Sequence, residues 1–515
     1  MKLRSAFVII LFSCVTVFIH QVKAGQKVFN IATLGAVGNG KTDNTHVIQK
    51  AIDNCTASGG GIVLVPQGKF VTGVIDLKSN VELRLAPNAQ LLATVKRIAY
   101  GPGKASPLIV ASGCKNIAIT GTGIINGRGE ALLKDIYRML RNGKLKDKEW
   151  KTYNEWHQLR PEEDNRPKLI FFKQCDNVKI SDVTIKNGLC WIQEYRACTN
   201  MLINNIKVIS NTFLNNDGID LVDCKKVKLT NSFFNVADDG ICLKSSDPKS
   251  FCEDIVITDC RIRSSASAFK MGTASFGGFK KITVRNIEVY DTFRSAVAIE
   301  SVDGGVIEDI DIRHVVAKNT GNAIFIRLGK RQKLRAAGSV SGIYIADVKA
   351  GIPAGKPDAG YHMEGPPEQF AHNVFPMSVA GIPGSPVSNV TLEGIDISYA
   401  AVAKKKVAWF NIDSLSKVPE QISAYPEFSM FGELPVSAFY ARHAEGINLK
   451  NIHVNYTGYD FRTPFVFDDV NGLIAEKINV SGFKTLPLLL LNNVKVNKLL
   501  DIQPADKRDH VIKTQ

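Results

Sequence analysis

The phrase "CKKVKLT", residues 224–230, is one copy of a pattern that recurs along the chain. Other copies are "CKNIAIT" from Cys114, "CDNVKIS" from Cys175, "CTNMLIN" from Cys198 and "CEDIVIT" from Cys252. Each copy alternates apolar and polar residues over about five positions, which is typical of a strand with one buried side. From Cys175 onward the copies are 23 to 28 residues apart. This spacing predicts a β-solenoid, because stacked coils bury the apolar side that one coil cannot bury alone.

Later copies keep the alternation and lose the cysteine, as in "FKKITV" from Phe279, "VIEDIDI" from Val306 and "GINLKNIHV" from Gly446. We therefore predict an all-β chain, one solenoid domain over residues 25–515. The cysteines would form an inner ladder of buried thiols that act as small hydrophobes. Nine remain beyond Cys14, and an odd count argues against a complete disulfide framework. The absence of a CxxC motif disfavours metal ligation.

Two segments interrupt the repeat. Residues from about 131 to 165 are charged and helix-like, and residues 351–386 are rich in glycine and proline. Long insertions in solenoids tend to be functional loops on one face, so we expect both near a binding groove. They would otherwise cover non-functional surface or contact a neighbouring molecule.

The first 24 residues have the pattern of a secretory signal peptide. Lys2 and Arg4 precede an apolar run that is too short to span a bilayer comfortably, and "VKA" ends at Ala24. Cleavage near Ala24 would export the chain to the periplasm or the medium. Cys14 raises a lipoprotein alternative, although Phe12 fits a lipobox poorly. No later apolar run is long enough to form a membrane-spanning helix.

We also expect a monomer, because the two ends of the solenoid are cap-like.

The chain has a formal net charge of +15, which suggests a polyanionic partner. Exported nucleic-acid binders are uncommon, so an acidic plant-type polysaccharide is the better prediction than nucleic acid. A solvated basic surface would explain the same charge.

"GAVGNGKT", residues 35–42, matches the phosphate-binding pattern G-x-x-x-x-G-K-[ST]. The downstream coil repeat does not contain the alternating strands and helices in which that loop occurs. We interpret it as a glycine-rich turn before a helix that caps the N-terminal end of the solenoid. Thr42 or Asp43 would lie near the N-cap of that helix.

Two acidic stretches lie about one coil apart. "NNDGID", residues 215–220, contains Asp217, and "NVADDGICLKS", residues 235–245, contains Asp238 and Asp239. Coils stack about 4.8 Å apart, so the three carboxylates could share one patch. At least one of them should then have a raised pKa and carry a proton. A protonated acid beside ionised partners suits inverting glycoside hydrolysis. Turns and calcium sites use the same residues, so both remain alternatives.

The chain also resembles glycoside hydrolase family 28, the polygalacturonase family, over most of its length. The similar stretches include "GGGIVLVPQGKF", "GTGIINGRGE", "RPKLIFF" and "GIDLVDCKKVKLTNSFFNVADDGICLKS". The resemblance implies a right-handed parallel β-helix that cleaves galacturonan-type bonds with inversion. It also implies that Asp238 donates the proton while Asp217 and Asp239 hold and activate the water. We predict no cofactor and no metal.

The sequence departs from the family in the next two coils. Where the family has G-H-G, "ASAFKMGTAS" places Ser267 at the histidine position and Lys270 close by. Where the family has R-I-K, the chain has Ala298 and Glu300. These changes predict that the catalytic acids are kept, whereas the residues that bind the sugar are altered. They favour a pectin side chain or a rhamnogalacturonan-type backbone, as well as galacturonan, as the substrate.

Further candidates for sugar contact are Lys270, Glu300, Asn215, Trp191 as a stacking platform and Arg327 as a carboxylate partner. His362, Glu364 and the loop 425–435 are weaker candidates. Two other functions remain open. A polysaccharide lyase would need a base, for which Lys270 is the local candidate, and a non-catalytic glycan-binding module would explain the missing histidine. Long insertions favour exo action over endo action.

Overall fold

A computed structural model describes residues 27–153, 158–400, 412–432, 434–483, 487–504 and 512–514. The predicted signal peptide, with Cys14 and Ala24, lies outside these residues. In the described part, no helix is both long and apolar enough to cross a membrane.

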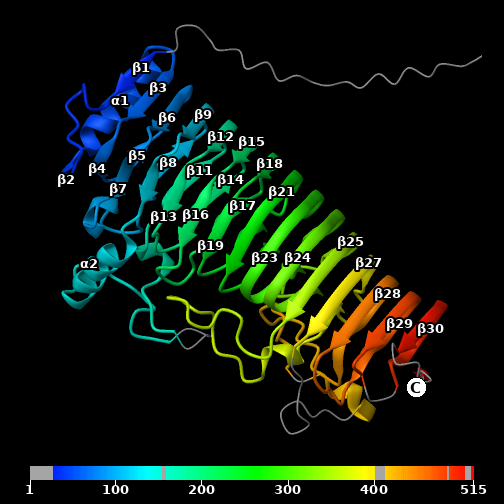
Figure 1. Cartoon of the computed structure of the whole chain (residues 1–515). Helices are drawn as coiled ribbons and strands as arrows, with labels where there is room; N and C mark the ends of the chain where they lie inside the picture. Colours follow the sequence, from blue (N-terminus) through cyan, green and yellow to red (C-terminus); the bar gives the residue numbers. More distant parts are fainter. Residues whose placement is uncertain are drawn as a thin grey trace, which may run out of the picture.

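The chain forms one continuous parallel β-helix (Figure 1), and every pairing between its named strands is parallel. The prediction of a right-handed, all-β solenoid is confirmed. The first coil contributes strands to two faces, and each of the next six coils contributes one short strand to each of three faces. The first face contains β1 (Val28–Asn30), β3 (Gly61–Val65), β6 (Val81–Leu85), β9 (Lys115–Thr120), β12 (Asp176–Ser181), β15 (Thr199–Asn204) and β18 (Lys225–Thr230).

The second face contains β2 (Asn39–Asp43), β4 (Gly68–Thr72), β7 (Ala89–Ala93), β10 (Ile124–Asn126), β13 (Thr184–Lys186), β16 (Lys207–Ser210) and β19 (Phe233–Val236). The third contains β5 (Ile75–Asp76), β8 (Ile109–Ser112), β11 (Ile170–Lys173), β14 (Gln193–Arg196), β17 (Ile219–Val222), β20 (Ile241–Ser245) and β22 (Phe269–Ser275).

Most of the later strands are longer and run from one face to the next, whereas two of them have only 4 and 3 residues. The later strands are β21 (Cys252–Ser264), β23 (Gly278–Ser301), β24 (Val306–Leu328), β25 (Ser339–Ile352), β26 (Met377–Ala380), β27 (Val387–Tyr399), β28 (Val436–Tyr456), β29 (Thr463–Ser481), β30 (Leu489–Pro504) and β31 (Ile512–Thr514). Among the described residues, two α-helices, α1 (Thr45–Ala57) and α2 (Gly129–Arg141), accompany four 3₁₀ turns, Arg97–Tyr100, Glu163–Asn165, His372–Val374 and Ile412–Lys417.

The repeat cysteines stack in the interior, as predicted. Strand register aligns the residues that follow Cys175, Cys198 and Cys224, and it pairs Cys252 with Phe279 of the next coil. Larger apolar side chains therefore continue the ladder where the cysteine motif ends. All nine cysteines of the described part are buried and free of disulfides. Their thiols fill the core as small hydrophobes, and burial raises the pKa of several of them, including Cys252 to about 12.

This packing predicts the outcome of a thiol titration. The native protein should react slowly or not at all with an aromatic disulfide reagent, because the thiols are buried and protonated. After unfolding in denaturant, nine thiols per chain should react, or ten if Cys14 is retained. Rapid reaction of several thiols in the native protein would contradict the ladder.

Asparagine and aspartate occupy the corners of the coils because these residues tolerate the left-handed backbone conformation. Asn116 has φ 54° and Asn177 has φ 56°. The Asn177 side chain donates a hydrogen bond to Asn116 Oδ1 at 2.8 Å, and Asn116 donates to Asn80 Oδ1 at 2.8 Å. The corners thus stack in register, which aligns each coil with the one before it.

Helix α1 packs against the first coil and buries Ile48, Ala51, Ile52 and Cys55. It lies at the N-terminal end of the stack (Figure 1), so the predicted cap is present. The N-cap residue is Asn44, so Thr42 and Asp43 lie near the N-cap, two positions and one position before it. Asp43 Oδ1 still accepts a hydrogen bond from the Thr45 backbone N–H at 2.9 Å. Residues 39–43 of the glycine-rich stretch form β2, which pairs with β4.

The two insertions lie on the same long side of the β-helix (Figure 1). The first contains α2, and the second follows β25. The Met363 N–H donates to Asn211 Oδ1 at 2.9 Å, and Ser265 Oγ donates to the Met363 carbonyl at 2.6 Å. These contacts hold the second insertion beside the coils that carry the acidic stretches.

Candidate active site

Strand register brings the acidic stretches together at the third face. Ile219 of β17 pairs with Ile241 of β20, which pairs with Phe269 of β22. Counting back two residues aligns Asp217, Asp239 and Ser267. Carboxylate oxygens of Asp217, Asp238 and Asp239 all lie within 4.8 Å of one another. The arrangement that the one-coil spacing predicts is therefore present, with Asp238 beside the stacked pair.

The glycine after each acidic group is required by the stacking. A Cβ at Gly218 would lie 2.4 Å from the Gly240 carbonyl oxygen, and a Cβ at Gly240 would lie 2.6 Å from the Ala268 oxygen. The Gly218 N–H donates to the Asp239 carbonyl at 2.8 Å. The glycine of each "DG" pair is therefore needed for close contact between neighbouring coils rather than for a sharp turn.

Two lysines, the half-buried Lys244 and the buried Lys270, form ion pairs with Asp217 and Asp239. Lys244 Nζ lies 3.1 Å from Asp217 Oδ2 and also forms an ion pair with Asp220. Lys270 Nζ lies 3.2 Å from Asp239 Oδ2 and 3.8 Å from Glu300 Oε2. The Lys270 side chain is only 2% exposed, so these interactions are shielded from water.

The surroundings of the three aspartates shift their pKa values in different directions. Burial, together with the charges of Asp217 and Asp239, raises the pKa of Asp238 to about 7. Burial also raises the pKa of Asp217. Burial acts in the same direction on Asp239, but the nearby Lys270 and Lys244 outweigh it and lower the Asp239 pKa. Near neutrality, Asp238 can therefore hold a proton beside an ionised Asp239.

A cavity of about 270 Å³ opens over these carboxylates. Its lining comes from the β-helix, the first insertion and the loop before β28. The residues are Arg160, Glu163, Trp191, Asn215, Asp217, Asp238, Asp239, Lys244, Lys270, Thr273, Arg294 and Tyr425. Asp238 is partly exposed, whereas Asp217 and Asp239 are each 4% exposed. None of these lining residues is a histidine, in keeping with the loss of the family's G-H-G motif.

The cations of the cavity are already paired with protein carboxylates. Besides Lys244 and Lys270, Arg294 lies 3.3 Å from Glu427, and Arg160 lies 3.6 Å from Glu149. A substrate carboxylate would have to compete with these acids.

Several predicted contact residues lie at the cavity. Trp191 lines it, with Lys168 Nζ 4.0 Å and Lys244 Nζ 4.2 Å from its ring centroid. Asn215 also lines it, with φ 56°, and its Oδ1 accepts hydrogen bonds from Arg160 and Arg166. Glu300 lies behind Lys270, and Thr273 Oγ1 donates to Glu300 Oε2 at 3.3 Å.

Arg327 is not at the cavity, so the structure does not support it as a carboxylate partner. Its guanidinium is buried and donates to the carbonyls of Gly381 at 2.7 Å, Glu420 at 2.7 Å and Gln421 at 3.1 Å. It anchors the loop that carries Tyr425. His362 and Glu364 also lie elsewhere. His362 is largely exposed beside Glu130, and Glu364 pairs with Lys356.

Sequence reasoning missed Lys244, Arg160 and Arg294. Lys244 could have been found, because it follows Cys242 by two positions and so points to the same side of β20. The two arginines carried no such signal. Arg160 comes from an insertion, and Arg294 lies in β23 where the strand register shifts, between Thr292 and Ser295.

Two acidic clusters of the described part have a geometry that could hold a cation, Asp217–Asp238–Asp239 and Asp217–Asp220–Cys242. The ammonium groups of Lys244 and Lys270 already lie against these carboxylates. A divalent ion would have to displace both lysines, which disfavours a metal centre here.

A parallel β-helix with three clustered carboxylates in a surface cavity is the arrangement that the sequence analysis expected of a glycoside hydrolase. Comparison with known proteins makes this specific. The model of glycosyl hydrolases family 28 matches residues 55–416, and the chain belongs to that family. It is therefore a glycoside hydrolase, as the sequence predicted.

The relatives agree with this assignment. A Vitis vinifera protein described as a probable polygalacturonase is 25% identical over 441 residues, which cover 77% of this chain and 80% of that protein. The exo-poly-alpha-D-galacturonosidase of Dickeya chrysanthemi is 29% identical over 266 residues, 42% of each chain. The fold resembles that of a Thermotoga maritima exopolygalacturonase, with a TM-score of 0.56 and 23% identity over 73% of this chain and 87% of that one.

Proposed function

We propose that the protein hydrolyses glycosidic bonds of pectic polysaccharide, of galacturonan or rhamnogalacturonan type, with Asp238 as the general acid. The observation that carries this proposal is the cluster of three aspartates in one cavity, in which Asp238 can keep a proton while Asp239 is ionised. The names of the relatives support a pectic substrate. The signal-like residues 1–24 support export.

The geometry suggests how the reaction proceeds. Asp238 donates its proton to the leaving glycosidic oxygen as the bond to the anomeric carbon breaks. Asp217 and Asp239 together hold a water beside the cluster, and Asp239 takes a proton from it as its oxygen attacks the anomeric carbon. Asp217 lines the cavity beside Asp239, so its carboxylate is placed to help hold that water.

The separation of the carboxylates does not by itself indicate inversion. Many inverting enzymes place two carboxyl groups about 6.5–9.5 Å apart, with the water between them. Here the nearest oxygens lie within 4.8 Å, so the water would lie beside the cluster. Support for inversion comes from membership of the family, and the anomeric form of the first product decides it.

The lyase alternative is disfavoured by the state of Lys270. A lyase base must give up its proton before it can abstract one from the substrate. Although burial opposes it, the charges of Asp239 and Glu300 raise the pKa of Lys270 well above its ordinary value. Lys270 therefore remains protonated and serves as a fixed cation. The non-catalytic alternative does not explain why the three aspartates have such different pKa values.

Incubation of the purified protein with pectin fractions tests the proposal. We expect saturated products whose new reducing ends have the inverted anomeric form by proton NMR, and we expect activity to persist in a chelator. The physical reason is that the lysines, rather than a metal, neutralise the site. Chelator-sensitive release of unsaturated, ultraviolet-absorbing ends would instead indicate a lyase.

A further inference from the structure

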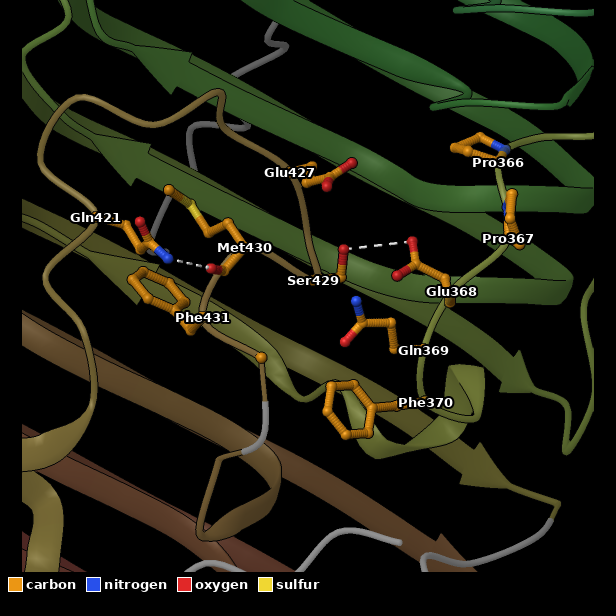
Figure 2. A pocket seen from close by; sticks show the side chains of 11 residues that line it. Pro366, Pro367, Glu368, Gln369, Phe370, Gln421, Glu427, Ser429, Met430 and Phe431 are labelled. Carbon is orange, nitrogen blue, oxygen red and sulfur yellow. Dashed lines mark hydrogen bonds between the residues drawn. The ribbon is translucent and has the colours of Figure 1, made fainter. Parts of the chain in front are cut away.

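A second cavity, of about 530 Å³, lies between two loops (Figure 2). One wall is the segment 366–370 of the second insertion, and the other belongs to the loop 421–432 that follows the 3₁₀ turn Ile412–Lys417. The volume falls within the range of small-ligand sites, about 300–1,000 Å³. We call it the loop pocket.

The loop pocket adjoins the catalytic cavity through a shared loop. Glu427 lines the loop pocket and lies 3.3 Å from Arg294, which lines the catalytic cavity. Tyr425, two residues earlier, also lines the catalytic cavity and accepts a hydrogen bond from Lys270 at 3.1 Å. The two cavities therefore neighbour one another on either side of the Arg294–Glu427 pair.

The lining of the loop pocket combines apolar surface with neutral polar groups. Phe370, Met430 and Phe431 provide apolar surface, on which the C–H face of a sugar ring can pack. Ser429 Oγ donates to Glu368 Oε1 at 3.3 Å, and Figure 2 shows this pair beside the Gln369 amide, with Phe370 below it. Such groups can bond sugar hydroxyls.

The loop pocket offers no cation to a uronic acid. Among the described residues that line it, the charged side chains are Glu368 and Glu427, and Glu427 already pairs with Arg294. Burial, with the charge of Glu427, raises the pKa of Glu368 to about 7, so this group can donate a hydrogen bond near neutrality. A ligand carboxylate here would lose its hydration and gain no counter-charge.

We propose that the loop pocket binds a neutral sugar unit of the substrate, so that the preferred chain carries neutral sugars as well as uronic acid. This inference rests on the proposed glycan hydrolysis and specifies its substrate class. The second insertion and the loop 421–432 would then act together as the specificity element of the enzyme.

Binding to the inactive Asp238→Asn protein tests the inference by titration calorimetry. The two probes are oligosaccharides of equal length, one of galacturonate alone and one alternating galacturonate with a neutral deoxyhexose. We expect the alternating chain to bind at least tenfold more tightly. Adding Phe370→Ala should remove most of that difference, and adding Gln369→Ala, at an exposed position that folding does not need, should reduce it several-fold. Adding Phe251→Ala, which removes a half-buried ring beside Lys280, should not change it.

Equal affinity for the two chains, or equal losses on both with Phe370→Ala and Gln369→Ala, would overturn the loop pocket as a neutral-sugar site. That result leaves the hydrolase proposal intact if the wild-type protein releases saturated ends from galacturonan. The hydrolase proposal fails separately, when the wild-type protein cleaves neither probe.

Discussion

Replacement of Asp238 by asparagine is expected to abolish hydrolysis while making the folded protein more stable above neutral pH. Loss of a general acid typically lowers the rate about 10²–10⁴-fold. Asparagine keeps the shape of the side chain and its neutral state, but it has no proton to donate. For the wild-type enzyme, kcat/KM should fall as the pH rises through about 7, because burial and the charges of Asp217 and Asp239 set the Asp238 pKa there.

The sign of the stability change follows from the direction of the pKa shift. Asp238 binds its proton more tightly when folded than when unfolded, so wild-type stability falls as the pH rises from about 4 to about 7. Above pH 7 the folded protein keeps the full cost of a charged Asp238. The neutral asparagine avoids this cost, so the variant should melt a few degrees higher at pH 8 and show no such gain at pH 4.

Thermal unfolding at the two pH values, together with initial rates on the active pectin fraction, measures both effects. Asp254→Asn is the matched control, because Asp254 is exposed and asparagine suits its left-handed backbone equally well. The control should match the wild type in rate and in melting temperature. A variant of Asp238 that keeps more than a tenth of the activity would rule out its role as the acid.

Replacement of Lys270 by methionine is expected to damage both catalysis and stability, for two separable reasons. The change removes the cation that lies 3.2 Å from Asp239 and lowers the pKa of that carboxyl. The pKa of Asp239 should rise, and the acidic limb of the kcat/KM profile should move to higher pH. At neutral pH we expect a loss of about 10²-fold or more, since less of the base is ionised.

The stability loss arises from acids that remain buried without their partner. Breaking a buried ion pair by removing one member costs about 3–5 kcal/mol. Adding Glu300→Gln to Lys270→Met removes one of the unpaired acids, so the double variant should regain much of the stability. It should not regain activity, because Asp239 still lacks its cation.

Denaturant unfolding and the pH dependence of kcat/KM distinguish these two effects. Lys226→Met, at a coil corner, is the control for loss of a lysine and should leave the pH profile unchanged. If Lys270→Met keeps the wild-type acidic limb, Lys270 does not tune Asp239. If the double variant regains activity together with stability, Lys270 has only a structural role.

Much of the site could be predicted because its parts are spaced by whole coils. Asp217 and Asp239 are one coil apart, so the strand register that stacks Ile219 on Ile241 also stacks the two carboxylates. The position of Lys270 follows from the same rule, because Lys270 lies one coil after Cys242 and pairs with it in the strand register. Lys270 Nζ also lies 3.8 Å from Glu300 Oε2, one coil further on.

Residues that reach the site from loops could not be predicted in this way. Tyr425 contacts Lys270 across 155 residues of sequence, and no repeat links the two positions. The interpretation of Arg327 as a partner for a substrate carboxylate failed for a related reason. Its place on β24 resembles that of a groove residue, but the loop around Gln421 folds over it and takes its hydrogen bonds.

The sequence alone determined the β-helix, the cysteine ladder and the meeting of the three aspartates. These features depend on alternation within a strand and on a nearly constant coil length, and both are local properties of the chain. Tertiary structure decided which cations lie against the aspartates, in which direction each carboxyl pKa is shifted and where the loop pocket opens. These depend on burial and on contacts between distant loops, because desolvation and charge act through space rather than along the chain.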